Sequence, residues 1–171
     1  MNKLLLIPLL LLIAACQGPE KKEATKKSPS VKEQKENIIQ LSTKHKPNII
    51  YCDMDGDKRK DTVQLVRNTS NYKYGLAIKF GNKKTKYLGM GEDVLGQGFD
   101  DLEWVGIFER VPKGEVVYNN VIGGEIITEE QVDEKDKIKL PNEGILIHQL
   151  ESCGGGIIYF ENGKLKWVQQ E

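Results

Sequence analysis

The chain has 171 residues, and its 25 basic and 25 acidic side chains give a formal net charge of zero. Hydrophobic residues make up 39% and charged residues 29%, which is ordinary for a globular protein. No basic cluster is interleaved with aromatic residues, so the sequence argues against a nucleic-acid partner.

The first residues have the pattern of an export signal. One positive charge, at Lys3, precedes the apolar run Leu4–Ile13, and the small residues Ala14 and Ala15 follow. A membrane-spanning helix needs about 20 apolar residues, and this run is too short. We therefore predict that the segment directs export and does not span a membrane.

The end of this segment, Ile13–Cys16, resembles the lipobox of bacterial lipoproteins, in which an apolar residue and two small ones precede a cysteine. The resemblance implies that residues 1–15 are a lipoprotein signal peptide and that Cys16 carries the lipid. Two or more acyl chains would anchor the protein stably in the cell envelope. Gln17 replaces the aspartate that retains some lipoproteins at the inner membrane, which favours the outer membrane, on its periplasmic or surface face. An ordinary secretory signal cut at an alanine is the alternative.

Residues 16–45 are predicted to form a charged, flexible tether. The segment is rich in Lys, Glu, Ser and Gln and has no aromatic residue, so it cannot bury enough apolar surface to offset its ordering entropy. A flexible chain of this length spans about 30 Å. A helix over residues 31–41 is an open alternative. Residues 46–171 are then the folded domain.

From Asn48 onward, apolar residues alternate more often than they recur at helical spacing. Leu76, Ile78 and Phe80, for example, share one face of a segment. Turn signals recur at short intervals, and Asn162-Gly163 has the composition of a tight hairpin turn. We predict an all-β, mostly antiparallel domain, built as a two-layer sandwich or a strongly curved sheet.

Two further features limit the possible architectures. About 125 residues cannot supply the four blades of a complete propeller, so the sheet must close its core in another way. Thr128–Gln131 has the spacing of a capping box, which predicts a short helix or a solvated loop. We expect at most one or two short helices outside the signal peptide.

The segment Cys52–Asp61, "CDMDGDKRKD", is the most specific motif in the chain. Calcium takes six to eight oxygen ligands, and a loop with carboxylates at positions 1, 3 and 5, a carbonyl at 7 and a further ligand at 9 can surround it. Gly56 permits a sharp bend, and the apolar "TVQLV" that follows is typical of a strand. The candidate calcium ligands are Asp53, Asp55, Asp57, the carbonyl of Arg59, and Asp61.

This loop resembles the Asp-rich calcium loop of FG-GAP and VCBS repeats, and most of the domain is similar to small uncharacterised bacterial lipoproteins with one such loop. The resemblance implies a structural Ca²⁺ held by the same five residues. Lys58 replaces the second glycine of the family pattern, so it must adopt an unusual backbone angle. In the alternative interpretation, Lys58, Arg59 and Lys60 neutralise the aspartates in a plain turn.

Two cysteines remain beside Cys16. In an oxidising compartment, Cys52 and Cys153 are candidates for a disulfide, and two buried free thiols are the alternative. His148 is near Cys153 in sequence, but its alternation with Leu146 and Leu150 indicates a packed strand residue. The sequence contains no zinc motif and no nucleophile motif, so we do not expect an enzyme.

These features favour a membrane-anchored protein with a calcium-braced β domain and a non-catalytic binding or scaffold role at the cell envelope. Its partner would be the membrane, through the lipid, together with an envelope protein or a glycan. The alternative is a glycan-binding or inhibitor module that uses the glycine-rich loop Gly89–Asp101. Aromatic residues that could form a glycan platform, or pack in the core instead, are Phe99, Trp104, Tyr118 and Trp167.

Overall fold

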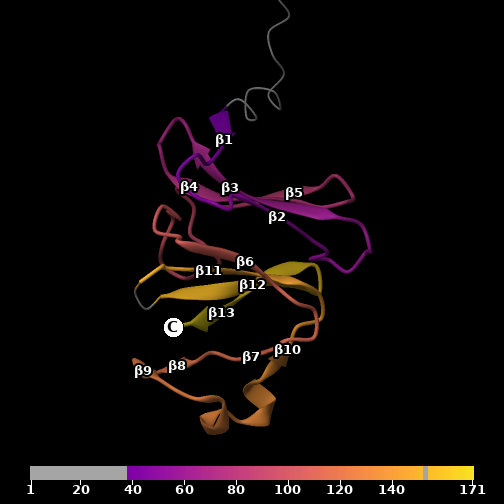
Figure 1. The fold of residues 1–171 in the computed structure, drawn as a ribbon, viewed down its shortest axis with the longest axis vertical. Helices are drawn as coiled ribbons and strands as arrows, with labels where there is room; N and C mark the ends of the chain where they lie inside the picture. Colours follow the sequence, from indigo (N-terminus) through magenta and orange to yellow (C-terminus); the bar gives the residue numbers. More distant parts are fainter. Residues whose placement is uncertain (1–37, 152–153) are drawn as a thin grey trace, which may run out of the picture.

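A computed structural model describes residues 38–151 and 154–171 of the chain, and antiparallel strands dominate it (Figure 1). This confirms the predicted all-β class, and no propeller or helix of seven or more residues occurs in these ranges. The strands are β1 (Ile39–Leu41), β2 (Ile49–Cys52), β3 (Asp61–Asn68), β4 (Tyr74–Lys79), β5 (Thr85–Gly89), β6 (Ile107–Val111), β7 (Val116–Val117), β8 (Val121–Ile122), β9 (Glu125–Ile126), β10 (Ile138–Lys139), β11 (Gly144–His148), β12 (Gly155–Glu161) and β13 (Lys164–Gln170).

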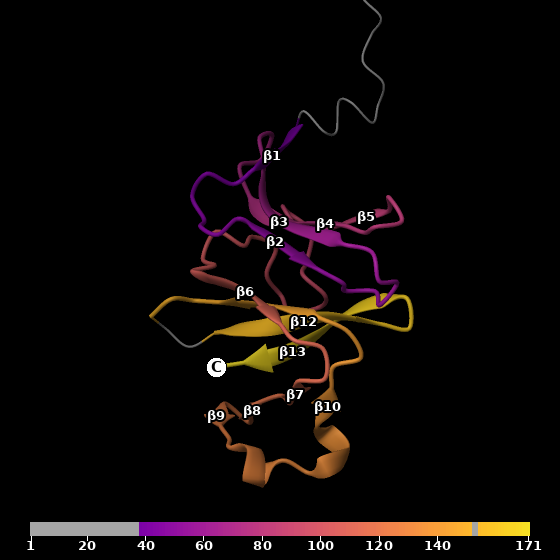
Figure 2. The same ribbon diagram turned by 45° about the vertical axis from the view of Figure 1, so that its right-hand side comes forward.

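Two sheets form the two layers of a sandwich. The N-terminal sheet has the order β1-β3-β4-β5, and β2 also pairs with β3. β2 and β1 follow one another along the same edge of β3, β2 beside residues 61–64 and β1 beside residues 66–68. The C-terminal sheet has the order β13-β12-β11-β6. Figures 1 and 2 show the N-terminal sheet stacked above the C-terminal sheet, so the two-layer sandwich is the correct alternative.

The main core lies between these two sheets. Leu65 of β3 is paired with Leu76 of β4, and Ile145 of β11 is paired with Ile158 of β12. All four side chains are fully buried in one hydrophobic cluster. Burying a side chain of this size contributes about 1.5–3 kcal/mol to folding, so this contact joins the layers firmly.

A second cluster covers the outer face of the C-terminal sheet. Ile157 and Tyr159 of β12 point away from the main core and pack with Val117 of β7 and Leu140 beside β10. The segment β7–β10 therefore lies beneath this sheet as a partial third layer, which both ribbon views show (Figure 2). The near-continuous apolar run of β12, "GIIYF", reflects its burial on both faces.

The folded domain begins earlier than the sequence analysis predicted. β1 pairs with β3, and two residues assigned to the tether, Ser42 and His45, are only 1% and 5% exposed. The Ser42 hydroxyl and His45 Nδ1 lie 2.7 Å apart, and the Asn48 side chain donates to the Ser42 carbonyl. The predicted boundary between residues 45 and 46 is therefore wrong, because residues 39–45 belong to the β domain. Residues 1–37, with the predicted signal peptide, Cys16 and most of the tether, lie outside the described residues.

Two local predictions are confirmed. Asn162 and Gly163 both have positive φ and join β12 to β13 in a tight hairpin. Thr128 precedes a 3-10 helix, Glu129–Gln131, and its N–H donates to the Gln131 side chain across 2.8 Å, as in a capping box. A second 3-10 helix, Glu134–Asp136, follows. Within residues 38–151 and 154–171, no helix is long and apolar enough to cross a membrane.

Candidate metal centre

The aspartate loop joins β2 to β3 at one end of the N-terminal sheet. Cys52 and Asp61 are register partners in the two strands, so the loop begins and ends at one point of the ladder. Gly56 and Lys58 have φ values of 76° and 64°, both in the left-handed region. The prediction that Lys58 occupies a backbone conformation favoured by glycine is therefore confirmed, and the two positive angles curl the loop inward.

Three of the four aspartates converge on one point. One carboxylate oxygen each of Asp53, Asp55 and Asp61 lies within 4.8 Å of the other two. Oxygens bound to a single Ca²⁺ at about 2.3–2.6 Å are at most roughly 5 Å apart. This spacing therefore fits one divalent cation at the centre of the triad, which could supply three of its oxygen ligands.

Asp53 carries the atom that most needs a cation. Its Oδ2 accepts a hydrogen bond from the Lys58 N–H at 3.1 Å, whereas its Oδ1 is buried and has no hydrogen-bond partner among the described residues. A buried polar atom without a partner costs about 1–3 kcal/mol, and more when it is charged. An ion within the triad would satisfy this oxygen, so the donor set fits a hard cation.

Asp61 anchors the triad to the rest of the sheet. Its side chain is fully buried, with Oδ2 accepting from the Met54 N–H and Oδ1 from the Gly81 N–H, both at 2.8 Å. Burial raises the pKa of this carboxyl group, and the two backbone donors act in the opposite direction. A carboxylate oxygen has two lone pairs, so each can accept a hydrogen bond and still bind an ion.

Asp57 is not part of the triad. Its carboxylate is paired with Arg59, 2.9 Å from Nε and 2.6 Å from Nη2. This hydrogen bond is the main reason that the pKa of Asp57 is lowered. The structure therefore does not bring the predicted ligand Asp57 to the other three, and for this one residue the charge-neutralised turn is the better interpretation. The carbonyl of Arg59 stays a predicted ligand.

Residues far away in the sequence support the loop. Glu143 Oε2 accepts from the Asp53 N–H at 2.7 Å, and Glu143 Oε1 is 3.0 Å from Arg110 Nη1. The Asn142 side chain lies against Gly56, where an added Cβ would be 2.4 Å from Asn142 Oδ1. Sequence analysis missed these contacts, since nothing near residues 142 and 143 signals an aspartate loop 90 positions earlier.

Cys52 is a free, buried thiol beside the metal loop. Burial raises its pKa to about 12, so it is protonated and unreactive at neutral pH. This agrees with the buried-thiol alternative for Cys52, and the disulfide stays a prediction. Its proposed partner, Cys153, lies outside the described residues.

Three of the four candidate platform aromatics gather at the other end of the sandwich. The Phe99 ring centroid lies 5.5 Å from that of Trp104 and 5.8 Å from that of Trp167, both in edge-to-face geometry. All three are partly buried against the core and line a small hollow with Gln149 and Gln169. Tyr118 does not line it.

The glycine-rich stretch after Cys153 has a packing role in this hollow. An added Cβ on Gly156 would lie 2.2 Å from the Trp167 ring, so the indole lies directly against the backbone of β12.

Comparison of the chain with protein-family models, with curated proteins and with solved structures found no match.

Proposed function

We propose that this protein is a lipid-anchored component of the bacterial cell envelope whose β domain is braced by calcium and acts by binding or presentation rather than by catalysis. Two observations support the calcium: Asp53 has a buried carboxylate oxygen, Oδ1, without a hydrogen-bond partner among the described residues, and the Asp53 carboxylate lies close to those of Asp55 and Asp61. Three carboxylates in a partly buried setting favour a hard cation with oxygen ligands, which is the chemistry of Ca²⁺.

The ion would act as a brace because the loop contacts two other parts of the fold. Asp61 binds the backbone at Gly81, in the turn after β4. Asp53 binds Glu143, in the segment that leads into β11 of the other sheet. A cation shared by Asp53 and Asp61 would thus tie the β2–β3 connection to both layers. Extracellular calcium modules have dissociation constants of about 0.1–1 mM, which suits a constitutive brace.

Thermal melting with and without calcium tests this role. At a calcium concentration about 20 times the dissociation constant, binding stabilises the folded state by roughly 1.8 kcal/mol, which raises the melting temperature by about 5 °C. We expect this shift in the wild type and its loss in Asp55→Ala, because Asp55 contributes to the triad.

The matched control is Asp57→Ala, which removes the same side chain from the same loop but from outside the triad. It should keep the calcium shift, since Asp57 is bonded to Arg59. A melting temperature that ignores calcium in the wild type, or an equal loss in both variants, would contradict the proposal. Magnesium at the same concentration should have a smaller effect, because Mg²⁺ demands a stricter octahedral geometry.

The anchoring is supported by the lipobox-like Ile13–Cys16 and by the position of this motif ahead of the folded domain, which begins at β1. The test is growth of cells expressing the full chain with a labelled fatty acid. We expect label in the membrane-associated wild type and none in Cys16→Ser, which should be released from the membrane. Equal labelling of the two chains would exclude Cys16 as the acylated residue.

A second candidate function is glycan binding beside the Gly89–Asp101 loop. The supporting observation is the hollow of about 210 Å³ lined by Phe99, Trp104 and Trp167, with side-chain amides from Gln149 and Gln169. Typical ligand pockets measure roughly 300–1,000 Å³, so this hollow suits a single neutral ring at most.

Calorimetric titration with neutral saccharides tests this candidate, with Gln149→Ala as the site variant. The control is Gln97→Ala. Gln97 is an exposed residue of the Gly89–Asp101 loop and does not line this hollow. Binding that is lost only in Gln149→Ala supports the hollow as the site. Heat that is unchanged by both substitutions excludes it.

A further inference from the structure

Eight basic side chains of the domain gather around the metal loop. In the β4–β5 turn, the Gly81 N–H donates to Asp61 Oδ1, and Asn82 Nδ2 lies 3.4 Å from Asp55 Oδ2. Lys86 Nζ is 3.5 Å from the carbonyl of Gly163, in the β12–β13 turn. These contacts place three turns at the same end of the sandwich. We call this the basic end, defined by the exposed residues Lys58, Arg59, Lys60, Lys79, Lys83, Lys84, Lys86 and Lys164.

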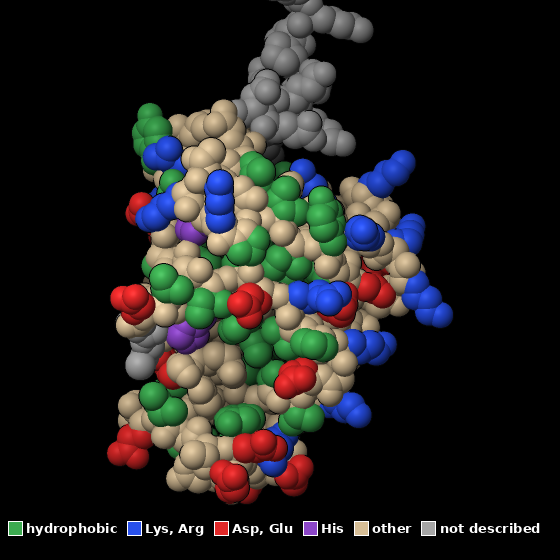
Figure 3. All heavy atoms as spheres, viewed as in Figure 1, with side chains coloured by type: hydrophobic (Ala, Val, Ile, Leu, Met, Phe, Trp, Pro, Cys, Tyr) green, Lys and Arg blue, Asp and Glu red, His purple; other side chains and the backbone are tan. Residues whose placement is uncertain are grey.

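These cations have few acidic partners. Among the described residues, Arg59 pairs with Asp57, and none of the seven lysines of the basic end forms an ion pair. The remaining carboxylates of the aspartate loop converge on the metal position. Eight basic residues against the loop's four aspartates leave a net charge of +4, and a bound divalent cation would raise it to +6. Figure 3 shows blue side chains projecting from the upper right of the molecule, where the N-terminal sheet lies.

The segment beneath the C-terminal sheet has the other sign. The segment from β9 to β10 carries six acidic residues against three lysines, two of which are paired with neighbouring carboxylates. Figure 3 shows red side chains gathered at the bottom of the view, over this segment. The domain therefore has a directional charge distribution, and an anionic surface would orient it with the basic end inward.

An exposed aromatic ring accompanies the basic end. Tyr51 of β2 is 55% exposed, and Lys60 Nζ lies 5.1 Å from its ring centroid. Tyrosine is enriched where proteins meet the headgroup layer of a membrane, because its ring is apolar and its hydroxyl is polar. Seven of the eight basic residues are lysines, whose compact charges suit a diffuse anionic layer better than base readout, which favours arginine.

We propose that the basic end docks the domain on the anionic lipid headgroups of a membrane. This inference rests on the proposed envelope location for the presence of a membrane, but the docking itself does not require calcium. Lysines close to an anionic surface each add to the attraction, which falls off within a Debye length. An ion bound by the aspartate loop would strengthen docking, because it cancels part of the negative charge of that loop.

Vesicle co-sedimentation tests the proposal with the chain from residue 16 onward carrying Cys16→Ser, which keeps every described residue and has no lipid of its own. The probes are vesicles of phosphatidylglycerol mixed with phosphatidylcholine, and vesicles of phosphatidylcholine alone. We expect binding to the anionic vesicles at ~0.05 M salt and its loss near 1 M salt, where the Debye length is about 3 Å.

The double variant Lys83→Glu with Lys84→Glu should weaken vesicle binding at least about tenfold. The control, Lys135→Glu with Lys139→Glu, makes the same charge change in the acidic segment from β9 to β10 and should leave binding unchanged. Melting curves of all chains establish that both doubles are folded. Equal binding to neutral vesicles, or equal effects of the two doubles, would overturn the proposal.

Two further outcomes separate this inference from the calcium proposal. If calcium raises the melting temperature but anionic vesicles are not bound, docking is wrong and the brace stands. If vesicles are bound without any calcium effect on melting, docking stands and the brace fails. Retention of the chain by single-stranded DNA but not by vesicles would overturn the lipid assignment.

Discussion

Two loops of this domain are rich in aspartate and glycine, but they differ in how their carboxylates are satisfied. In the Gly89–Asp101 loop, Asp93 accepts from the N–H groups of Gly96 and Gly98, and Asp101 accepts from the Tyr74 N–H. Asp100 is paired with a lysine.

The aspartate loop between β2 and β3 is different. Asp53 keeps one buried oxygen without a partner among the described residues, and its carboxylate lies close to those of Asp55 and Asp61. Acidic residues in a loop are thus weak evidence for a metal. A buried oxygen without a hydrogen-bond donor is stronger evidence, because buried polar atoms are nearly always paired and an ion could supply the missing partner.

The largest expected effect is that of Asp61→Ala. This change leaves the Met54 and Gly81 N–H groups without their acceptors and should lower the free energy of unfolding by about 3 kcal/mol. Urea denaturation measures it in EDTA and in calcium. The loss should persist in EDTA, because it comes from hydrogen bonds and not from the ion. A variant as stable as the wild type in EDTA would show that Asp61 has no bracing role of its own.

Asp53→Asn should have an effect that depends on calcium. In EDTA we expect stability equal to the wild type or up to about 1 kcal/mol higher, because the change removes an unsatisfied charge beside two like charges. In calcium, the wild type should gain roughly 1.8 kcal/mol and the variant should not. Paired unfolding curves measure both. A variant that loses stability equally in the two conditions would indicate that Oδ1 has a protein partner.

Asp93→Ala probes the loop whose carboxylates are satisfied. It removes two hydrogen bonds to exposed backbone, so we expect a loss of about 0.5–1 kcal/mol that is the same with and without calcium. Glu92→Ala, at an exposed neighbouring position, is the matched control and should be neutral. If the effect of Asp93→Ala depended on calcium, a second ion would bind in the Gly89–Asp101 loop, and the two loops would no longer differ in this respect.

The smallest effect should be a response of the β1–β2 connection to pH. Burial lowers the pKa of His45 below its ordinary value of 6.5, and its Nε2 contacts the Glu103 carbonyl at 3.3 Å. Because the unfolded chain binds a proton more readily, this group's contribution to stability is complete above pH 6.5 and is lost as pH falls from there towards the lowered pKa.

His45→Gln should therefore flatten the decline in stability below pH 6.5, which urea denaturation at several pH values measures. EDTA in every sample removes divalent cations, so that metal binding by the aspartate loop does not contribute to the pH dependence. A decline of equal slope in the wild type and His45→Gln would assign the pH response to other groups.

The features of the fold that could be predicted from the sequence were mostly local ones. Alternation identified the strands, Asn162-Gly163 identified a hairpin, and the missing glycine at Lys58 identified a strained loop position. Each of these signals depends on residues close together in the chain. The sequence does not decide between a sandwich and a curved sheet, because which sheets face one another depends on contacts between distant segments.

The errors have the same physical origin. The loop pattern could not decide that Arg59 would bind Asp57 and withdraw it from the other aspartates, since alternating carboxylates look equivalent in sequence. The supports from Asn142 and Glu143 come from the other sheet and have no local signal. The charged surroundings of Ser42 and His45 suggested a tether, although both are buried.

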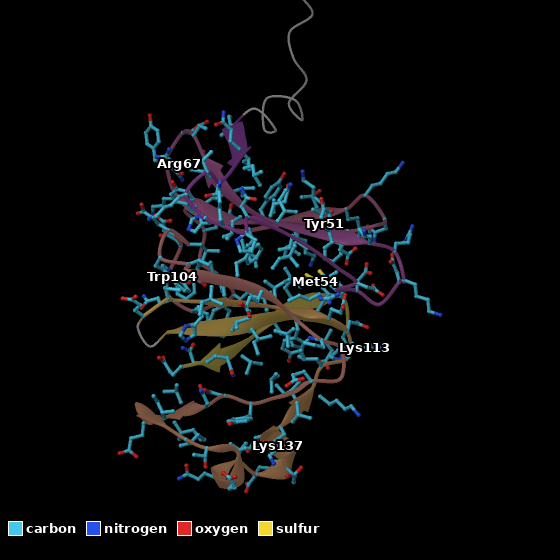
Figure 4. All side chains as sticks on the ribbon, viewed as in Figure 1. Tyr51, Met54, Arg67, Trp104, Lys113 and Lys137 are labelled. Carbon is cyan, nitrogen blue, oxygen red and sulfur yellow. The ribbon has the colours of Figure 1, made fainter. Side chains whose placement is uncertain are left out.

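The placement of Trp167 against Gly156 has a practical consequence. Both tryptophans of the chain line the same hollow, near Gln149, whereas the aspartate loop approaches the C-terminal sheet near Glu143, at the other end of β11. Figure 4 shows Trp104 at the left of the view and Met54, from the aspartate loop, to the right of its centre. Indole fluorescence is therefore an optical reporter of one end of the domain only. An emission change on adding calcium would mean that the ion's influence travels through the whole sandwich.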